Sequence, residues 1–151
     1  MKSVRLFFLM LLLLAACSIP SGELTVENVR ANLTLPSSTG SVWLVIENGT
    51  DSDDALIGAE IPGCGVVELH DMIMDGDVMK MQPVEGGKVI VPAGETVELK
   101  MGGLHIMCID KEAPLEPGTS IAIALQFENA GTINVTGEVV EPGEMEMKKD
   151  N

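Results

Sequence analysis

The stretch Ser41-Val-Trp-Leu-Val-Ile-Glu47, followed by Asn48-Gly49, decides the fold class of this chain. β-Branched and aromatic residues favour an extended strand, and Asn-Gly is a preferred dipeptide of tight hairpin turns. Comparable short runs, rich in Val, Ile, Leu and Thr and bounded by Gly, Pro, Asn or Asp, follow one another along most of the chain. This pattern predicts an all-β protein.

The number and closeness of these runs favour a sandwich or a barrel. No window keeps an apolar stripe at helical spacing for three turns, so long helices are not expected. The expected strands lie near residues 24–31, 41–47, 55–61, 66–72, 78–84, 89–91, 96–100, 105–109, 120–127 and 133–140.

The N-terminal segment has the pattern of a secretory signal. Lys2 and Arg5 precede an apolar run at 6–14, which is too short to span a bilayer, since spanning takes about 20 apolar residues. Leu14-Ala15-Ala16-Cys17 resembles a bacterial lipobox, whose cysteine is lipidated. We therefore expect an extracytoplasmic protein, in the periplasm or at the cell surface, anchored to a membrane by lipid on Cys17. An ordinary signal peptide cut nearby is the alternative.

The chain is long enough for one folded domain between this segment and a charged C-terminal end. The expected division is a signal peptide at 1–16, lipidated Cys17 and a tether at 17–22, a single domain at 23–141 and a flexible charged tail at 142–151.

The composition excludes several classes of partner. The chain has 23 Asp and Glu against nine Lys and Arg, a formal net charge of −14. Such a surface repels nucleic acid and favours cationic partners or metal ions. Aromatic residues make up only 3% of the chain, so platforms that stack bases or sugars are not expected.

Methionine and histidine gather in two segments. One is His70-Asp-Met72-Ile-Met74-Asp-Gly-Asp-Val-Met79-Lys-Met81, and the other is His105-Ile-Met107; together they contain both histidines of the chain. Residues two apart share a face of a strand, so each histidine has a methionine beside it. Thioethers suit Cu(I) and need not lose a proton to bind, and imidazole suits copper generally. The pattern predicts a surface His/Met site that exchanges Cu(I) with a partner.

Methionine is also an ordinary core residue, and Met74 and Met79 fit that interpretation. Metal binding is favoured for the cluster as a whole because methionine accompanies both histidines.

The spacing of these residues resembles the PCuAC-type periplasmic copper chaperones, whose motif is His, ten residues, Met, somewhat over twenty residues, and His-x-Met. Here ten residues separate His70 from Met81, and 23 separate Met81 from His105, slightly more than is usual for the family. The amino-acid sequence also resembles that of the family at residues 40–48, 67–71, 81–87, 91–94 and 102–107. The resemblance therefore covers roughly residues 24–140.

The resemblance implies a cupredoxin-like Greek-key β-sandwich with a Cu(I) site. It implies His70, Met81, His105 and Met107 as ligands, with Met72 in reserve. It also implies delivery of copper to cytochrome c oxidase, either directly to its subunit II or through a thioredoxin-like assembly factor.

Two other functions compete with a copper chaperone. An electron-transfer site of the blue copper type needs a Cys thiolate, two His and a weak axial Met, but no His follows closely after Cys108. A non-metal assembly lipoprotein of the same fold would use its methionines only for packing. We do not expect an enzyme, because the acidic residues near His70 are not joined by a nucleophile and base.

Cys64 and Cys108 remain after the lipobox cysteine is set aside. In an oxidising compartment a disulfide is the default expectation. A buried free thiol is an alternative, and so is an extra copper ligand at Cys108. Because Cys108 directly follows Met107, its side chain should point to the opposite face of the strand, which argues against ligation.

Overall fold

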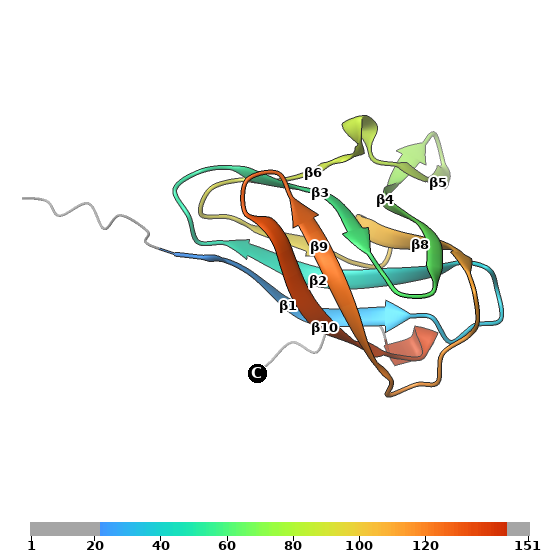
Figure 1. Cartoon of the computed structure of the whole chain (residues 1–151). Coiled ribbons are helices and arrows are strands. Elements are labelled where there is room, and N and C mark those ends of the chain that lie inside the picture. The colour runs from blue at the N-terminus through green and yellow to red at the C-terminus, as the bar shows by residue number, and fades with distance from the viewer. Residues whose placement is uncertain (1–21, 145–151) are drawn as a thin grey trace, which may run out of the picture.

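The computed structural model describes residues 22–144, which contain ten strands and two short 3-10 helices (Figure 1). The strands are β1 (Leu24–Asn32), β2 (Gly40–Asn48), β3 (Asp54–Glu60), β4 (Cys64–Asp75), β5 (Val78–Pro83), β6 (Val89–Val91), β7 (Thr96–Leu99), β8 (His105–Lys111), β9 (Ser120–Phe127) and β10 (Gly131–Val139), and the 3-10 helices are η1 (Glu85–Gly87) and η2 (Pro142–Glu144). The predicted all-β class is confirmed, and each of the ten expected strands is present.

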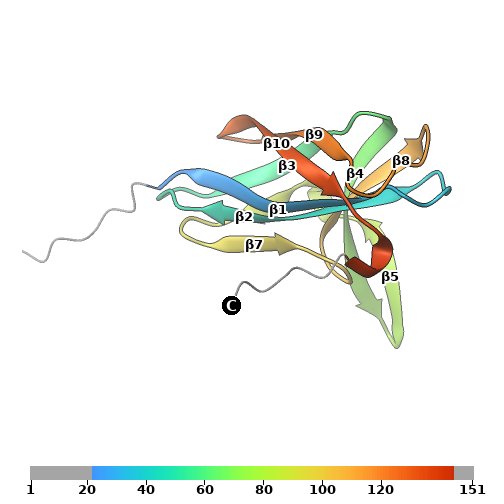
Figure 2. The same ribbon diagram turned by 90° about the horizontal axis from the view of Figure 1, so that it is seen from below.

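The strands form one continuous hydrogen-bonded sheet that folds over into a sandwich. Its order is β5-β4-β8-β2-β1-β10-β9-β3-β6, and β7 pairs with β2. Figure 2 shows β1, β2 and β7 in one layer and β3, β9 and β10 in the other. The layers are joined where β1 runs parallel to β10, with Arg30 beside Glu138 and Ala31 beside Val139.

The core lies between the layers because the strands alternate between buried and exposed residues. On β9, Ile121, Ile123, Leu125 and Phe127 are buried at every second position, as a strand with one face on the core requires. Strand β2 likewise buries Val42, Leu44 and Ile46, which belong to the same hydrophobic cluster as the buried residues of β9. Burying a side chain of this size contributes about 1.5–3 kcal/mol.

Strand β2 pairs with two strands along one edge, β8 and β7. The turn between β7 and β8 lies where one partner gives way to the other. Residues 40–42 pair with β8, and residues 44–47 pair with β7. The chain reverses between β7 and β8, where the Lys100 N–H donates to Leu104 O and Gly103 N–H donates to Lys100 O. Gly102 has a φ of 74° in this turn, a conformation that suits glycine.

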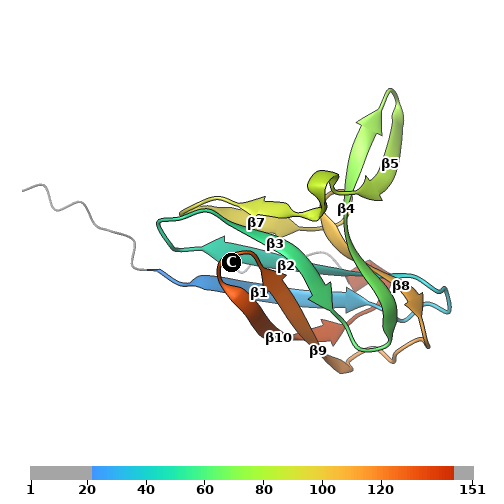
Figure 3. The same ribbon diagram turned by 45° about the horizontal axis from the view of Figure 1, so that its top comes forward.

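Strand β4 also has two partners, and its outer half leaves the sandwich. Residues 64–70 pair with β8, His70 also pairs with β5, and residues 71–75 pair only with β5. We call residues 70–83 the arm; Figure 3 shows it projecting away from both layers. Gly76, with a φ of 64°, begins its two-residue turn, as the first position of a type II′ hairpin turn requires.

Cys64 and Cys108 form a disulfide, with their Cα atoms 5.5 Å apart. The bond fastens the start of β4 to β8, and Cys108 is fully buried. In this structure Cys108 is therefore neither a free thiol nor a copper ligand.

Three sequence predictions fall on residues outside the described part: the signal peptide, lipidation of Cys17, and the tail beyond residue 144. Within residues 22–144, no helix is long and apolar enough to cross a membrane.

Candidate metal centre

The predicted ligands lie where β8, β4 and β5 meet, on the face turned away from the core. The strand registers place His70 opposite His105, and Met72 opposite Met81. Directly paired residues share a face of an antiparallel sheet, as do residues two apart on one strand. Met107, two residues from His105, therefore lies on this face as well.

The opposite face of the same strands is built from core residues. Leu69 pairs with Ile106, and Val67 pairs with Cys108. Leu69, Ile106 and Cys108 are buried. The fixed core side holds the registers of β4 and β8, and thereby positions the residues on the outer side.

Four of the five predicted residues line one pocket of about 300 Å³: Met72, Met81, His105 and Met107. Strand β2 contributes Trp43, which is the single tryptophan of the chain. The remaining lining residues include Leu35, Ser37 and Thr39 from the loop between β1 and β2, and Met101 from the turn between β7 and β8.

His105 is held in one orientation by the turn that precedes it. Its side chain is buried, and Nδ1 lies 2.9 Å from Gly103 O. A carbonyl oxygen only accepts, so Nδ1 carries the hydrogen and Nε2 of the neutral ring keeps a free lone pair. Metal-binding histidines are typically oriented in this way, through a hydrogen bond from the other ring nitrogen.

His70 contacts the pocket through His105, without being one of its lining residues. The two rings meet edge to face, with centroids 5.9 Å apart. Nε2 of His70 is 2.8 Å from Oε2 of Glu68, and Nδ1 is buried without a hydrogen-bond partner. An unpaired buried polar atom costs about 1–3 kcal/mol and calls for an explanation. A metal ion bound at Nδ1 would provide one, with Glu68 orienting the ring.

Met101 is a residue that the sequence analysis missed. It lies in the turn between β7 and β8, and 63% of it is exposed. It lines the same pocket as Met107, although it belongs to no alternating His/Met pattern. Its place four residues before His105 is the only sequence signal that points to it.

The donors favour a soft metal ion. Among residues 22–144 there is no group of three His, Cys, Asp or Glu side chains that would hold a metal. The pocket instead offers thioethers and imidazole, which suit Cu(I). Met81, half exposed, stands at the solvent side, whereas His105 is buried, so one part of the donor set is fixed and another is free to exchange.

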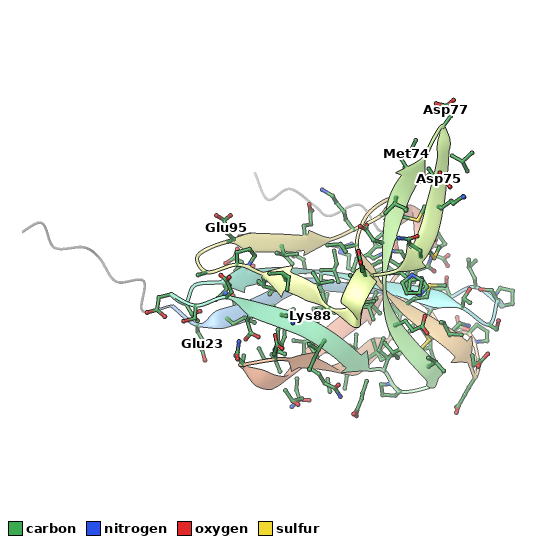
Figure 4. The ribbon with its side chains drawn as sticks, turned by 90° about the horizontal axis from the view of Figure 1, so that it is seen from above. Glu23, Met74, Asp75, Asp77, Lys88 and Glu95 are labelled. Carbon is green, nitrogen blue, oxygen red and sulfur yellow. A yellow bond between two sulfur atoms is a disulfide. The ribbon has the colours of Figure 1, made fainter. Side chains whose placement is uncertain are left out.

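The interpretation of Met74 and Met79 as core residues is wrong. Their exposed fractions are 61% and 52%. Figure 4 shows Met74 at the outer part of the arm with Asp75 and Asp77, away from both layers.

The fold defines the class of protein: it is the fold of PCuAC domains, the cupredoxin-like β-sandwich that the family resemblance implied. The apo PCuAC domain from PmoF1 matches with a TM-score of 0.67 at 22% identity, over 80% of this chain and 96% of that domain. The copper-bound PCuAC domain from PmoF2 matches with a TM-score of 0.66 at 20% identity, over 80% and 95%. The solution structure of CuI-DR1885 from Deinococcus radiodurans matches with a TM-score of 0.63 at 25% identity, over 85% and 87%.

Residues 24–139 match the family of putative lipoproteins described as LpqE-like, and the chain belongs to this family. It is also similar to the putative lipoprotein Lxx21020 of Leifsonia xyli subsp. xyli (strain CTCB07), at 31% identity over 87 residues. That match covers 58% of this chain and 52% of the relative, so the chain spans about half of the relative's length.

Proposed function

We propose that this chain is an extracytoplasmic copper chaperone, which binds Cu(I) through His70, Met81, His105 and Met107 and passes it to a partner protein. One observation carries the proposal: three strands bring Met72, Met81, His105 and Met107 to one pocket. Two of the structurally similar proteins are described as copper-bound and as a CuI form, which supports the choice of metal.

The arrangement suits transfer more than permanent storage. The buried His105 offers Nε2 as a fixed donor, and Met81 and Met101 offer thioethers from exposed positions. An incoming ligand from a partner can replace an exposed thioether while the imidazole still holds the ion. Copper stays Cu(I) throughout, because only ligands are exchanged.

The recipient follows from the resemblance to PCuAC-type proteins. It would be a copper-accepting protein of cytochrome c oxidase assembly, either subunit II of the oxidase or a thioredoxin-like assembly factor. A lipid anchor on Cys17, outside the described residues, would keep the chaperone at the membrane where such partners reside. The net charge of −14 favours a recipient with a positively charged docking face.

Among residues 22–144, the two cysteines do not offer the ligand of an electron-transfer site of the blue copper type. A blue copper site needs a cysteine thiolate, and Cys108 is bonded to Cys64. We also propose a non-enzymatic function, because holding and releasing a metal ion requires no catalytic group.

The test is a titration of the full chain, in detergent solution, with Cu(I) against a chromophoric chelator under anaerobic conditions. We expect the wild type to bind one equivalent of Cu(I) tightly. The affinity should be at least tenfold lower in His105→Ala and in Met107→Leu. Trp43 fluorescence gives a second readout, because this single tryptophan lines the pocket. Ile90→Leu, an exposed apolar change on β6, is the matched control. Absence of binding, or binding that neither site variant weakens, would contradict the proposal.

A further inference from the structure

Met74 and Met79 form a directly opposed pair on the arm. Met74 of β4 pairs with Met79 of β5, one residue pair away from the turn at Gly76. Every residue of β5 is exposed, so this pair lies in solvent rather than against the sandwich. A group of large apolar side chains exposed on the protein surface often marks a binding site.

The pair continues a line of methionines that starts at the pocket. The next pair on the same face of the arm, toward the sandwich, is Met72 with Met81, and both of these residues line the pocket. Residues two apart share a face, so all four thioethers lie on one side of the arm. The two pairs lie two positions apart along the strands, with Ile73 and Lys80 between them, which is a distance of about 7 Å.

The geometry within the outer pair allows both sulfur atoms to reach one ion. Directly opposite Cβ atoms of antiparallel strands are about 4.5–5.5 Å apart. Methionine side chains are unbranched and flexible, so their sulfur atoms can converge without a change of backbone. Two thioethers are soft, uncharged donors of the kind that Cu(I) accepts.

The charge at the end of the arm favours a cation. Asp75 and Asp77 flank Gly76, and Figure 4 shows them beside Met74 at the end of the arm. Lys80 forms an ion pair with Asp75, whereas Asp77 has no such partner among residues 22–144. Exposed carboxylates raise the local concentration of cations and speed their arrival.

We propose that Met74 and Met79 form an outer Cu(I) site, separate from the pocket, which captures the ion and passes it to the Met72–Met81 pair. Each step replaces one thioether by another at Cu(I), so no electron is transferred. Binding at the outer pair stands on its own, and only the passage inward rests on the proposed function of the pocket.

The test for the outer site uses the full chain, labelled with ¹³C at the methionine methyl groups and titrated with Cu(I) under anaerobic conditions. We expect the first equivalent to shift the methyl signals of Met81 and Met107, and a second, weaker equivalent to shift those of Met74 and Met79. The double variant Met74→Leu/Met79→Leu should lose only the second equivalent. Val78→Leu, on the same arm, should keep both.

The outcomes separate the outer site from the proposed function. Unmoved signals of Met74 and Met79 would overturn the outer site, even if the pocket binds tightly. The variant His105→Ala/Met107→Leu should lose the first equivalent while the signals of Met74 and Met79 still shift. If the wild-type pocket bound no copper and those signals shifted, the outer site would stand and the chaperone function would fail.

The passage inward has a kinetic test. We expect the double variant Met74→Leu/Met79→Leu to take Cu(I) from a chelator several-fold more slowly than Val78→Leu, with unchanged affinity for the first equivalent. Equal rates in the two variants would overturn the passage.

Discussion

The methionines of the pocket differ in burial, and this difference predicts unequal contributions to binding. Met107 is half-buried on a strand, whereas Met101 lies in a turn and is 63% exposed. An exposed side chain loses more conformational freedom when it binds an ion, which offsets part of its gain. We expect Met107→Leu to weaken Cu(I) binding at least tenfold, which is about 1.4 kcal/mol, and Met101→Leu to weaken it less than threefold. Chelator competition measures both, and the reverse order would show that Met101 is a principal ligand.

We expect Asp54, which does not line the pocket, to make a pH-dependent contribution to stability. It is 7% exposed, and its carboxylate accepts hydrogen bonds from the backbone N–H groups of Ala55, Asn129 and Ala130 at 2.7–2.9 Å. Burial acts to raise the pKa of Asp54, but the backbone donors outweigh it and hold the pKa below its usual 3.8. Because the folded pKa is lowered, the stabilisation is present above pH 3.8 and is lost as the pH falls through the folded pKa.

We therefore expect Asp54→Ala to lower the free energy of unfolding at pH 7 by about 2 kcal/mol. The difference from the wild type should shrink as the pH falls from 3.8 through the lower pKa of the folded state, where the wild-type carboxylate becomes protonated. Urea denaturation at several pH values measures it. Asp51→Ala, an exposed neighbour, is the control and should change stability by less than about 0.5 kcal/mol.

At the scale of the elements, the sequence was sufficient to find the strands but not the arm. All ten were predicted because alternation and turn residues are local signals. Strand β4 was expected to end at 72, yet it continues to Asp75 because β5 pairs with its outer half. Met101 enters the pocket through the packing of a turn, and no local pattern encodes that contact. Register brings His70 opposite His105, a long-range pairing that spacing alone does not fix.

The disulfide joins two elements that carry the site, and we expect it to stabilise the fold strongly. Cys64 and Cys108 are 44 residues apart in sequence. Closing a loop of that length in the unfolded chain is worth about 4 kcal/mol on the chain-entropy model. We expect Cys64→Ala/Cys108→Ala to lower the unfolding free energy by 2–4 kcal/mol and to weaken Cu(I) binding, because β4 and β8 are then held less firmly.

Urea denaturation with and without a reductant measures the effect of the disulfide. The wild type should lose stability on reduction, and the variant should not respond. Equal stability of the oxidised wild type and the variant would show that strand pairing alone holds β4 to β8.

At the scale of the whole molecule, the site connects segments that are distant in sequence. Strands β4, β5 and β8, strand β2 through Trp43 and the loop between β1 and β2 all contribute to one pocket. The pocket therefore exists only in the folded chain, although single thioethers remain available after unfolding. Cu(I) binding should therefore stabilise the folded state. The stabilisation should be somewhat smaller than it would be if the unfolded chain bound no copper at all.

We expect Cu(I) to raise the melting temperature in proportion to the logarithm of its free concentration. A ligand at 100 times its Kd adds about 2.7 kcal/mol when it binds only the folded state. For a chain of this size, that free energy corresponds to a rise in melting temperature of about 5–10 °C. Copper that binds the unfolded chain would make the rise smaller. Differential scanning calorimetry at several buffered Cu(I) concentrations measures the rise. His105→Ala/Met107→Leu should show little or none, because it lacks the fixed donors of the pocket. If the variant rose as much as the wild type, the stabilisation would come from copper bound elsewhere, and the pocket would not be the principal site.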